Sequence, residues 1–257
     1  MKPKITVIIS TKDRARYLME TLNSLVHQTM DEWECIVVQN TCGDWTDFSI
    51  NTFSDNRIST YEHKVPGKCN ALNFVQDNVK IKSPYVSLFD DDDIMMPCNL
   101  ETKLKMFEDT GADLVYSAYY ALLGNNEMIY CPSKDFNYDS FINRPYFGHG
   151  ATACKTDFWL ATKYNPEYTA ALDYEWVTRA TRTAKKLAYT NIPLYMYRKQ
   201  PNSISEAQRG NLSRFMFAKA QTAAEEYTGK VKTECERWYH AQRNVERELV
   251  KLKNNKE

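Results

Sequence analysis

Four consecutive aspartates, Asp90 to Asp93, are the side chains of this sequence best suited to carry out chemistry. They directly follow an apolar run over residues 85–89, so the acidic segment is expected at the end of a strand. If the segment stays extended, Asp90 and Asp92 share one side while Asp91 and Asp93 point elsewhere. Carboxylate oxygens suit Mg²⁺ or Mn²⁺, and substrate phosphates commonly complete the shell around such ions. The run therefore predicts a divalent metal site that acts on a nucleoside diphosphate.

The same aspartates also permit a purely structural interpretation. Carboxylates favour the N-termini of helices, and residues 97–107 combine a proline with apolar positions at helical spacing. In this interpretation the run is a solvated loop whose last member, Asp93, caps the following helix. The aspartates alone leave both interpretations open, and both hold if Asp93 caps the helix while its neighbours bind the metal.

The segments around the acidic run predict an α/β fold. Between residues 5 and 122, short apolar runs alternate with stretches of helical periodicity, which is typical of βαβ units on a mostly parallel sheet. Open sheets of this kind bind ligands beyond the carboxyl ends of their strands, where the acidic run falls. We expect strands at residues 5–9, 35–38, 58–61 and 85–89, and helices through residues 18–26 and 71–75.

The second part of the sequence is less regular. A hairpin is expected from strands at 114–122 and 127–131, followed by a long aromatic loop over residues 132–148. Two short helices and a strand at 194–197 come next. From residue 206 the chain is helical and densely charged, so residues 206–257 are predicted to form a C-terminal helical extension.

The composition excludes several classes of protein. Lysine plus arginine equals aspartate plus glutamate at 33 each, so no overall field draws the chain toward nucleic acid or anionic lipid. The seven cysteines are scattered without a C-x-x-C pair, which argues against a disulfide framework and a zinc site and favours a reducing compartment. No stretch approaches the roughly 18 apolar residues of a membrane span, so no span is expected and a cytoplasmic location is predicted.

Five segments, taken together, resemble the family 2 inverting glycosyltransferases of GT-A fold. Each segment alone is a weak signal, but all five occur in the order of that family. They are Ile5–Arg14, Glu34–Asn40, Gly67–Asn73, Leu88–Asp93 and Leu172–Trp176. The resemblance implies a GT-A type, Rossmann-like nucleotide-binding sheet flanked by helices, with a catalytic domain over residues 1–205. Residues 1–122 are its expected nucleotide-sugar-binding half, and residues 123–205 its acceptor-side half.

By this resemblance, Ser10, Asp13 and Asn40 at the tips of the first strands contact the nucleotide base and ribose. Lys68 is expected near the diphosphate, whose charge it offsets; an ordinary surface lysine at a helix start is the alternative. The second strand of the family usually ends in two acidic residues, whereas this chain has Gln39 and Asn40. An amide both donates and accepts, so a UDP-linked donor stays the expectation while another base is conceivable.

The resemblance also assigns the reacting groups. Asp92 holds Mn²⁺ or Mg²⁺, and Asp90 and Asp91 serve the metal or the ribose hydroxyls. Asp173 is the expected general base, which takes the proton of the attacking hydroxyl so that a single displacement inverts the anomeric centre. Asp173 also opens a helix whose N-terminus favours a carboxylate, which is a structural explanation for the same residue. Glu175 is the second candidate for the base.

Fewer residues inform the acceptor side. Many relatives have a histidine metal ligand where this chain has Gln200, so the third ligand is left open to water or another side chain. His149 follows the aromatic loop and is expected near the acceptor, with metal ligation as the alternative. Trp176 belongs to a group of aromatic residues that could stack on sugar rings or pack in the core. The others are Tyr138, Phe141, Tyr146 and Phe147.

Two other functions fit the same residues. A metal-dependent nucleotidyltransferase also uses paired aspartates on an α/β sheet, and a non-catalytic nucleotide-sugar-binding module would keep the fold without turnover. The hydroxyl acceptor is expected to be a glycan, and a hydroxylated nucleobase in DNA is the alternative because eight basic residues recur between 219 and 253. Glutamates alternate with these charges, which favours a solvated helix or one that forms a homo-oligomer.

Overall fold

The computed structural model describes residues 2–46, 50, 53–124, 127–199 and 210–228. In the first half, strands and helices alternate as the sequence predicts. In chain order the elements are β1 (Ile5–Thr11), α1 (Ala15–Val26), β2 (Trp33–Asn40), β3 (Ile58–His63), α3 (Lys68–Asn78) and β4 (Tyr85–Asp90). The predicted order of these elements is confirmed, with boundaries shifted by a few residues.

The second half mixes short strands with helices. Its elements are β5 (Ile94–Met95), α4 (Asn99–Thr110), β6 (Leu114–Leu122), β7 (Met128–Cys131), α5 (Tyr138–Asn143), the 3₁₀ turn η1 (His149–Ala151), β8 (Ala153–Lys155), α6 (Thr156–Ala161), α7 (Leu172–Thr183), β9 (Leu187–Arg198) and α8 (Gly210–Thr228). The predicted hairpin is confirmed, since β6 and β7 pair antiparallel.

Other predictions for this half were wrong in detail. Residues 132–148 are not one loop, because α5 begins where the side chain of Asn137 accepts a hydrogen bond from the backbone N–H of Ser140 at 2.9 Å. β8 is too short to leave a sequence pattern. β9 begins at Leu187 rather than at residue 194, because residues 187–190 pair in register with the buried strand β6.

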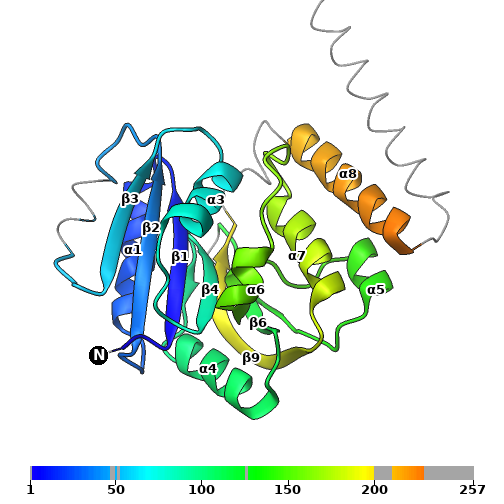
Figure 1. The fold of residues 1–257 in the computed structure, drawn as a ribbon, viewed down its shortest axis with the longest axis horizontal. Helices are drawn as coiled ribbons and strands as arrows, with labels where there is room; N and C mark the ends of the chain where they lie inside the picture. Colours follow the sequence, from blue (N-terminus) through cyan, green and yellow to red (C-terminus); the bar gives the residue numbers. More distant parts are fainter. Residues whose placement is uncertain (1, 47–49, 51–52, 125–126, 200–209, 229–257) are drawn as a thin grey trace, which may run out of the picture.

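Within the described residues, nine strands form one sheet in the order β3-β2-β1-β4-β8-β6-β9-β5, with β7 attached to β6. The first four strands of this order run parallel, and β6 and β9 are also parallel. β8, β7 and β5 run antiparallel to their neighbours. Helices flank the sheet (Figure 1), so the predicted α/β class is confirmed.

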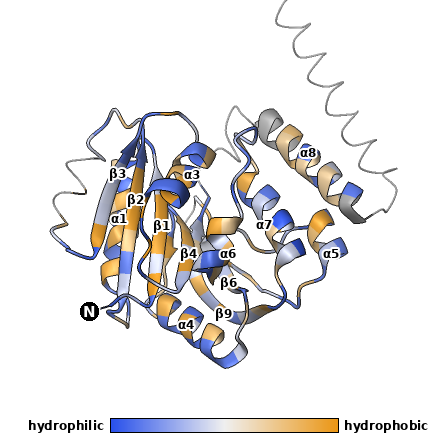
Figure 2. Ribbon diagram, viewed as in Figure 1, coloured by the Kyte–Doolittle hydropathy of each residue, from blue (hydrophilic) through white to orange (hydrophobic). Residues whose placement is uncertain are grey.

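The middle of the sheet is the hydrophobic core. All of β1 is buried. It pairs with β2 on one edge and β4 on the other, and it is one of the apolar strands in Figure 2, as expected for an interior strand. α1 packs on the sheet through Leu18, Leu22 and Leu25, which recur at helical spacing and are all buried. This packing fixes β1, β2 and β4 side by side, so that their carboxyl ends lie along one edge.

α8 is the described part of the predicted C-terminal extension. It lies beside α7 and α5 (Figure 1), where the rings of Tyr174 and Phe217 are 4.4 Å apart and Lys219 pairs with Glu167 at 2.8 Å. Residues 200–209 and 229–257, including Gln200 and most of the basic positions, lie outside the described residues. None of the helices described is both long and apolar enough to cross a membrane.

Candidate active site

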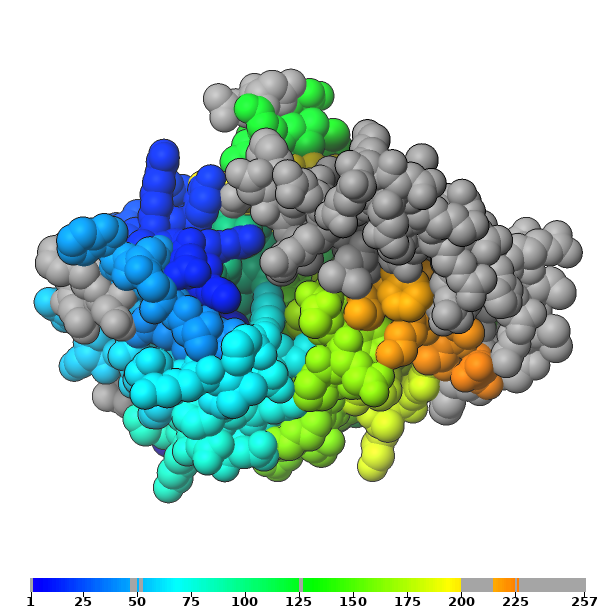
Figure 3. Space-filling model, turned by 90° about the horizontal axis from the view of Figure 1, so that it is seen from above, coloured from blue at the N-terminus to red at the C-terminus, as the bar shows by residue number. Residues whose placement is uncertain are grey.

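The acidic run lies at the carboxyl edge of the parallel strands. β4 ends at Asp90, whose Cα is paired in register with Ser10 near the end of β1. Viewed from this edge, the surface is hollowed between the blue N-terminal segment, the cyan residues of α3 and the yellow-green residues before and at α7 (Figure 3). The acidic run therefore lies at the carboxyl ends of the strands, as the sequence predicts.

Arg14 joins two of the aspartates. Its Nη1 atom lies 3.3 Å from Oδ1 of Asp91 and 2.5 Å from Oδ2 of Asp92. The expected separation of Asp90 and Asp92 from Asp91 is therefore wrong. The alternation would hold only in an extended chain, but the strand ends at Asp90 and the next two residues form a turn that brings both side chains to one guanidinium.

Asp93 does not cap the following helix, so that prediction was also wrong. β5 follows it, and α4 begins only at Asn99, after Cys98 at the N-cap position. Asp93 is buried, and its Oδ1 accepts the backbone N–H of Arg198 at 2.9 Å. Burial, followed by the charges of Asp90 and Asp92, raises the pKa of Asp93 well above its usual range. Asp93 thus ties the end of β9 to the acidic run.

Three of the four aspartates have a raised pKa, which favours their neutral form. Burial raises the pKa of Asp91 to about 6, against the opposing charge of Arg14. Burial and the charge of Asp90 raise the pKa of Asp92. Burial acts in the same direction on Asp90, but Lys68 outweighs it and the pKa of Asp90 is lowered. Crowded carboxylates of this kind gain most from an added cation.

The donor set fits a divalent ion. Hard carboxylate oxygens suit Mg²⁺ or Mn²⁺, and one or two of them suffice when phosphates complete the shell. In this structure Arg14 and Lys68 pair with carboxylates of the run. Among the described residues, the triplet that converges within 4.8 Å is Asp13, Cys42 and Asp44, at the tips of β1 and β2.

Lys68 is at the first position of α3 and forms an ion pair with Asp90. Burial opposes its charged form, but the nearby charges of Asp90, Asp91 and Asp173 outweigh burial and raise the pKa of Lys68. Lys68 is therefore a cation at the centre of the acidic cluster and not an isolated surface lysine. The structure brings together here the expected phosphate-side lysine, the acidic run and the expected base.

Asn40 is already fully engaged with the protein. Its Nδ2 donates to the carbonyl of Val65 at 2.7 Å and to that of His63 at 3.4 Å, and its Oδ1 accepts the N–H of Gly67 at 2.7 Å. These bonds hold the loop that leads into Lys68. Both amide hydrogens of this buried side chain are used within the protein, so we do not keep Asn40 as a residue that donates to a nucleotide base.

The two other residues at the strand tips remain close to the run. Ser10 is buried beside Asp90. Asp13 has a positive φ of 52°, and its Oδ1 accepts the backbone N–H of Gly43 at 2.7 Å. This bond joins the loop after β1 to the loop after β2. Both residues are thus placed where a nucleotide at this edge would lie.

Asp173 reaches the site from the other half of the chain. It is in the first turn of α7. The residue before this helix, Ala171, has a positive φ of 54°. The Oδ2 of Asp173 packs against Gly148, where an added Cβ would lie only 2.8 Å from that oxygen. The second candidate base, Glu175, pairs with Arg179 at 2.6 Å and is buried, so its carboxylate is already committed.

His149 and Trp176 form a buried layer beneath these groups. The indole of Trp176 is fully buried and donates to the carbonyl of Thr162 at 2.8 Å, so of its two alternatives the structure shows packing in the core. The ring of His149 lies edge-on to Trp176 and Tyr164. Burial, with the charge of Lys68, lowers the pKa of His149 to about 4, so this imidazole is neutral.

Arg14 was missed by the sequence analysis as a site residue. It directly follows Asp13 after β1, and β1 is the neighbour of β4 in the sheet. A basic residue at that tip is therefore within reach of the acidic run. The signal was present in the predicted strand order, but choosing Arg14 over Lys12 required the backbone path of the loop.

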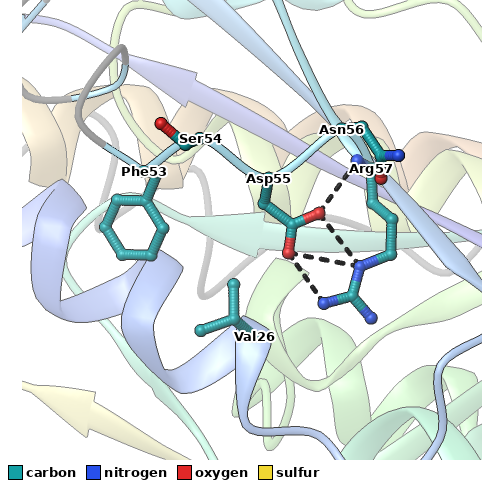
Figure 4. A pocket seen from close by; sticks show the side chains of 6 residues that line it. All are labelled: Val26, Phe53, Ser54, Asp55, Asn56 and Arg57. Carbon is teal, nitrogen blue, oxygen red and sulfur yellow. Dashed lines mark hydrogen bonds and ion pairs between the residues drawn. The ribbon is translucent and has the colours of Figure 1, made fainter.

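A second hollow lies at the other end of the parallel strands. A cavity of about 600 Å³ is lined by Val26 and by residues 53–57 (Figure 4). Its charged groups are Asp55 and Arg57, which bond to each other through Nη2 at 2.7 Å and Nε at 3.0 Å. They satisfy each other, so this cavity offers no free reactive group.

Known proteins resemble this chain over part of its sequence and in its fold. An uncharacterised glycosyltransferase of Rickettsia prowazekii is 29% identical over 139 residues, which cover 53% of this chain and 42% of that protein. The chain thus spans less than half the length of this relative.

Two solved structures share the fold. S. aureus TarS 1–349, solved with UDP-GlcNAc, has a TM-score of 0.69 at 16% identity, covering 93% of this chain and 79% of that one. A mannosyltransferase of Pyrobaculum calidifontis, solved with GDP-Man and Mn²⁺, has a TM-score of 0.63 at 16% identity, covering 91% and 66%. The expected GT-A type fold is confirmed by this likeness. The model of glycosyl transferase family 2 matches residues 6–160, and the chain belongs to that family.

Proposed function

We propose that the chain transfers a sugar from a nucleoside-diphosphate sugar, UDP-linked, to a hydroxyl acceptor with inversion at the anomeric carbon. The observation that carries this proposal is the gathering of acidic groups around Lys68. Asp90 forms an ion pair with Lys68, and the charges of Asp91 and of Asp173, which comes from a distant segment of the sequence, also raise the pKa of Lys68. Sugar transfer needs the groups that bind the donor diphosphate close to the group that serves the acceptor hydroxyl.

A divalent ion, Mn²⁺ or Mg²⁺, is proposed at Asp92 and Asp90. When bound, it would offset the negative charge that develops on the nucleoside-diphosphate leaving group. The chain itself supplies two more cations at this edge, Lys68 and Arg14, which pair with the carboxylates in this structure. With an ion at these carboxylates, Arg14 and Lys68 would be able to pair with phosphate oxygens. The third metal ligand is not assigned, because Gln200 lies outside the described residues.

Asp173 is the proposed general base. Its carboxylate is half-buried, at the start of a helix that is packed against Gly148 and anchored by Trp176. A base must stand within hydrogen-bond reach of the hydroxyl proton that it removes. Since Glu175 is committed to Arg179, Asp173 is the acid of this segment that is free to accept that proton.

The donor and acceptor are proposed from chemistry and from relatives. TarS was solved with UDP-GlcNAc, and an E. coli relative is named for transfer from UDP-Glc, which supports a UDP-linked donor. The mannosyltransferase was solved with GDP-Man, so guanosine donors belong in the test. Glycan hydroxyls are the proposed acceptors. The apolar side of α8 is covered by α7 and α5, so its described part gives no support to a homo-oligomer.

The first experiment measures nucleoside-diphosphate release from a panel of UDP- and GDP-sugars with Mn²⁺ and glycan acceptors. Wild type is compared with Asp92→Asn and with Asp109→Asn, a matched control on the exposed face of α4. Release that is abolished only by Asp92→Asn supports the proposal. Equal release from both variants would remove Asp92 from the mechanism, and pyrophosphate release from a nucleoside triphosphate would indicate nucleotidyl transfer instead.

Product analysis tests the stereochemistry and the base separately. Proton NMR of the glycoside formed from an α-linked donor should show a β-linkage in the wild type. Asp173→Asn should lower kcat by about 10²–10⁴-fold while donor binding stays unchanged, because proton transfer contributes that much to such reactions. An Asp173→Asn variant with wild-type kcat would rule out Asp173 as the base.

A further inference from the structure

Lys103 is a fully buried lysine on α4 that the proposed chemistry does not use. Its Nζ donates to the Oγ of Ser87 at 3.0 Å and to the carbonyl of Gly150 at 3.4 Å. Both acceptors are neutral, and both are buried. No carboxylate pairs with Lys103 in the described part of the chain, so its charge is solvated only by these two dipoles.

Burying such a residue destabilises the folded state. A buried ammonium without a counter-ion is among the rarest and costliest groups in protein interiors. Burial lowers the pKa of Lys103 to about 7, in keeping with this penalty. A methionine would fill a similar volume at no such cost. What the lysine adds over methionine is its N–H donors, and they bind two different elements.

The first of these elements is the strand that carries the acidic run. Ser87 lies in the middle of β4, fixed on one edge by Val7 of β1 and on the other by Ala153 of β8. β4 continues directly to Asp90. The position of Ser87 is therefore rigidly linked to that of the aspartates.

The second element is the turn that supports Asp173. Gly150 is in η1 and packs so closely on Tyr195 that an added Cβ would lie 2.7 Å from the ring. Gly148 comes two residues earlier and touches Oδ2 of Asp173. Thr152 closes the turn by donating to the carbonyls of His149 at 2.7 Å and Gly148 at 2.7 Å. A shift of this turn would therefore move the wall against which Asp173 rests.

We propose that Lys103 is a positioning residue: it ties the turn 148–152 to β4 and thereby fixes the carboxylate of Asp173 relative to the acidic run. This inference rests on the proposed function, in which the aspartates serve the donor and Asp173 serves the acceptor. Lys103 sets the spacing between the two, touching neither substrate. Displacing a reacting group by about 1 Å can cost about 10²-fold in rate, so the link matters for turnover more than for binding.

Kinetics provide the first test, with Lys103→Met, Lys103→Gln and the control Lys105→Met. Lys105 is on the same helix, but its side chain is 72% exposed and pairs with Asp109. Lys103→Met should lower kcat by about tenfold or more and change the donor KM by less than about threefold, because only positioning is lost. Lys103→Gln keeps a donor and should recover part of kcat, while Lys105→Met should match the wild type. A folded Lys103→Met protein with wild-type kcat overturns the proposal.

Hydrogen exchange provides a test that does not depend on activity. In Lys103→Met, the amide of Thr152, which donates to His149, should exchange faster than in the wild type and in Lys105→Met. The amide of Leu88, which donates to Thr152, reports the β4 side of the same link. Unchanged exchange at Thr152 would contradict the link even if kcat falls. If the wild type transfers no sugar, the proposed function fails while this measurement still decides whether Lys103 fixes the turn.

Discussion

Arg14 and Arg57 each contact two aspartates, but they do so at opposite ends of the parallel strands. At the amino ends, Asp55 accepts the backbone N–H, the Nε and the Nη2 of Arg57, only two residues away in sequence. Asp31, whose side chain is 76% exposed, adds a bond at 3.0 Å, and the guanidinium lies 3.8 Å from the ring centre of Trp33. Each charged group in this cluster thus has an oppositely charged partner.

At the carboxyl ends, an arginine also contacts two aspartates, but burial disfavours the charged form of these carboxylates. Arg14 meets Asp91 and Asp92 through one nitrogen, Nη1, across 77 and 78 residues of sequence. The hydrogen bond from Arg57 lowers the pKa of Asp55, whereas burial raises the pKa of Asp91 to about 6. The Arg57 cluster is satisfied as it stands, while the Arg14 cluster would gain from one more cation.

Residue types alone therefore do not mark a reactive site. A short-range Arg–Asp pair that is saturated with bonds stabilises the loop that contains it. Carboxylates that distant elements hold together, against burial and mutual repulsion, indicate a ligand whose charge relieves them. Substitutions at matched positions in the two clusters test whether this difference is functional.

The largest expected difference is in turnover. Asp92→Asn should lower kcat by about 10³-fold or more, because it removes a proposed ligand of the ion that stabilises the leaving group. Asp55→Asn should leave kcat within about twofold, since this carboxylate acts only on its own loop. Nucleoside-diphosphate release at saturating donor measures both. A comparable loss in the two variants would show that the contrast drawn between the clusters has no catalytic meaning.

The pH dependence of stability should also separate the two clusters. The folded pKa of Asp91 is raised to about 6 from 3.8, so its ionised form destabilises the folded state above pH 6. Asp91→Asn should therefore stabilise the protein by about 2–3 kcal/mol above pH 6, and the gain should disappear below about pH 4. The folded pKa of Asp55 is lowered, so Asp55→Asn should instead destabilise above pH 4.

Chemical denaturation in a chelating buffer from pH 4 to pH 8 measures both curves. Opposite signs for the two variants at pH 7 support the comparison. If Asp91→Asn destabilises the protein at pH 7, then Arg14 solvates this carboxylate well enough to cancel burial, and the two clusters are alike.

Gly148→Ala extends the comparison to the base. The new methyl group would lie 2.8 Å from Oδ2 of Asp173, so the carboxylate must move, and kcat should fall by about 10–100-fold. Gly124→Ala is the matched control, because nothing lies within 4 Å of a Cβ there. Donor affinity, measured by calorimetry, should stay unchanged in both. A Gly148→Ala variant with wild-type kcat would show that the position of Asp173 is not critical.

The smallest expected effect is at Arg57. Arg57→Met should lower the free energy of unfolding by about 1–2 kcal/mol, because it leaves Asp55 without its charged partner. Its kcat and donor affinity should equal those of the wild type. Thermal unfolding together with the release assay measures this, and a lowered kcat at unchanged donor affinity would connect the amino ends of the strands to the site after all.

The parallel half of the fold followed from the sequence because its signals are local. Ile5–Ile9 and Cys35–Val38 are continuous apolar runs, and such runs arise where a strand is covered on both faces. β8 and the early start of β9 could not be predicted, because their pairing with β4 and β6 depends on partners far away in the chain. Asn137 illustrates a local signal that was present but overlooked, since its side chain caps α5.

The candidate site divides in the same way. The place of Asp90 at the end of β4 and that of Asp173 at the start of α7 follow from local pattern and family order. The partners of Arg14 and Asn40 do not, because each depends on how a loop folds over a neighbouring strand. Trp176 shows the limit most clearly, since an aromatic residue one turn from the base could face the solvent or the core, and only packing decides.

The most direct test of the account is calorimetric titration of UDP into the wild type, Asp92→Asn and Asp55→Asn, each with Mn²⁺ and with a chelator. Mn²⁺ should tighten UDP binding by about tenfold or more in the wild type and in Asp55→Asn, because an ion held by the carboxylates would attract the diphosphate. In Asp92→Asn the ion should make no difference. Undiminished Mn²⁺ dependence in Asp92→Asn would contradict the claim that the acidic run at the end of β4 holds the metal.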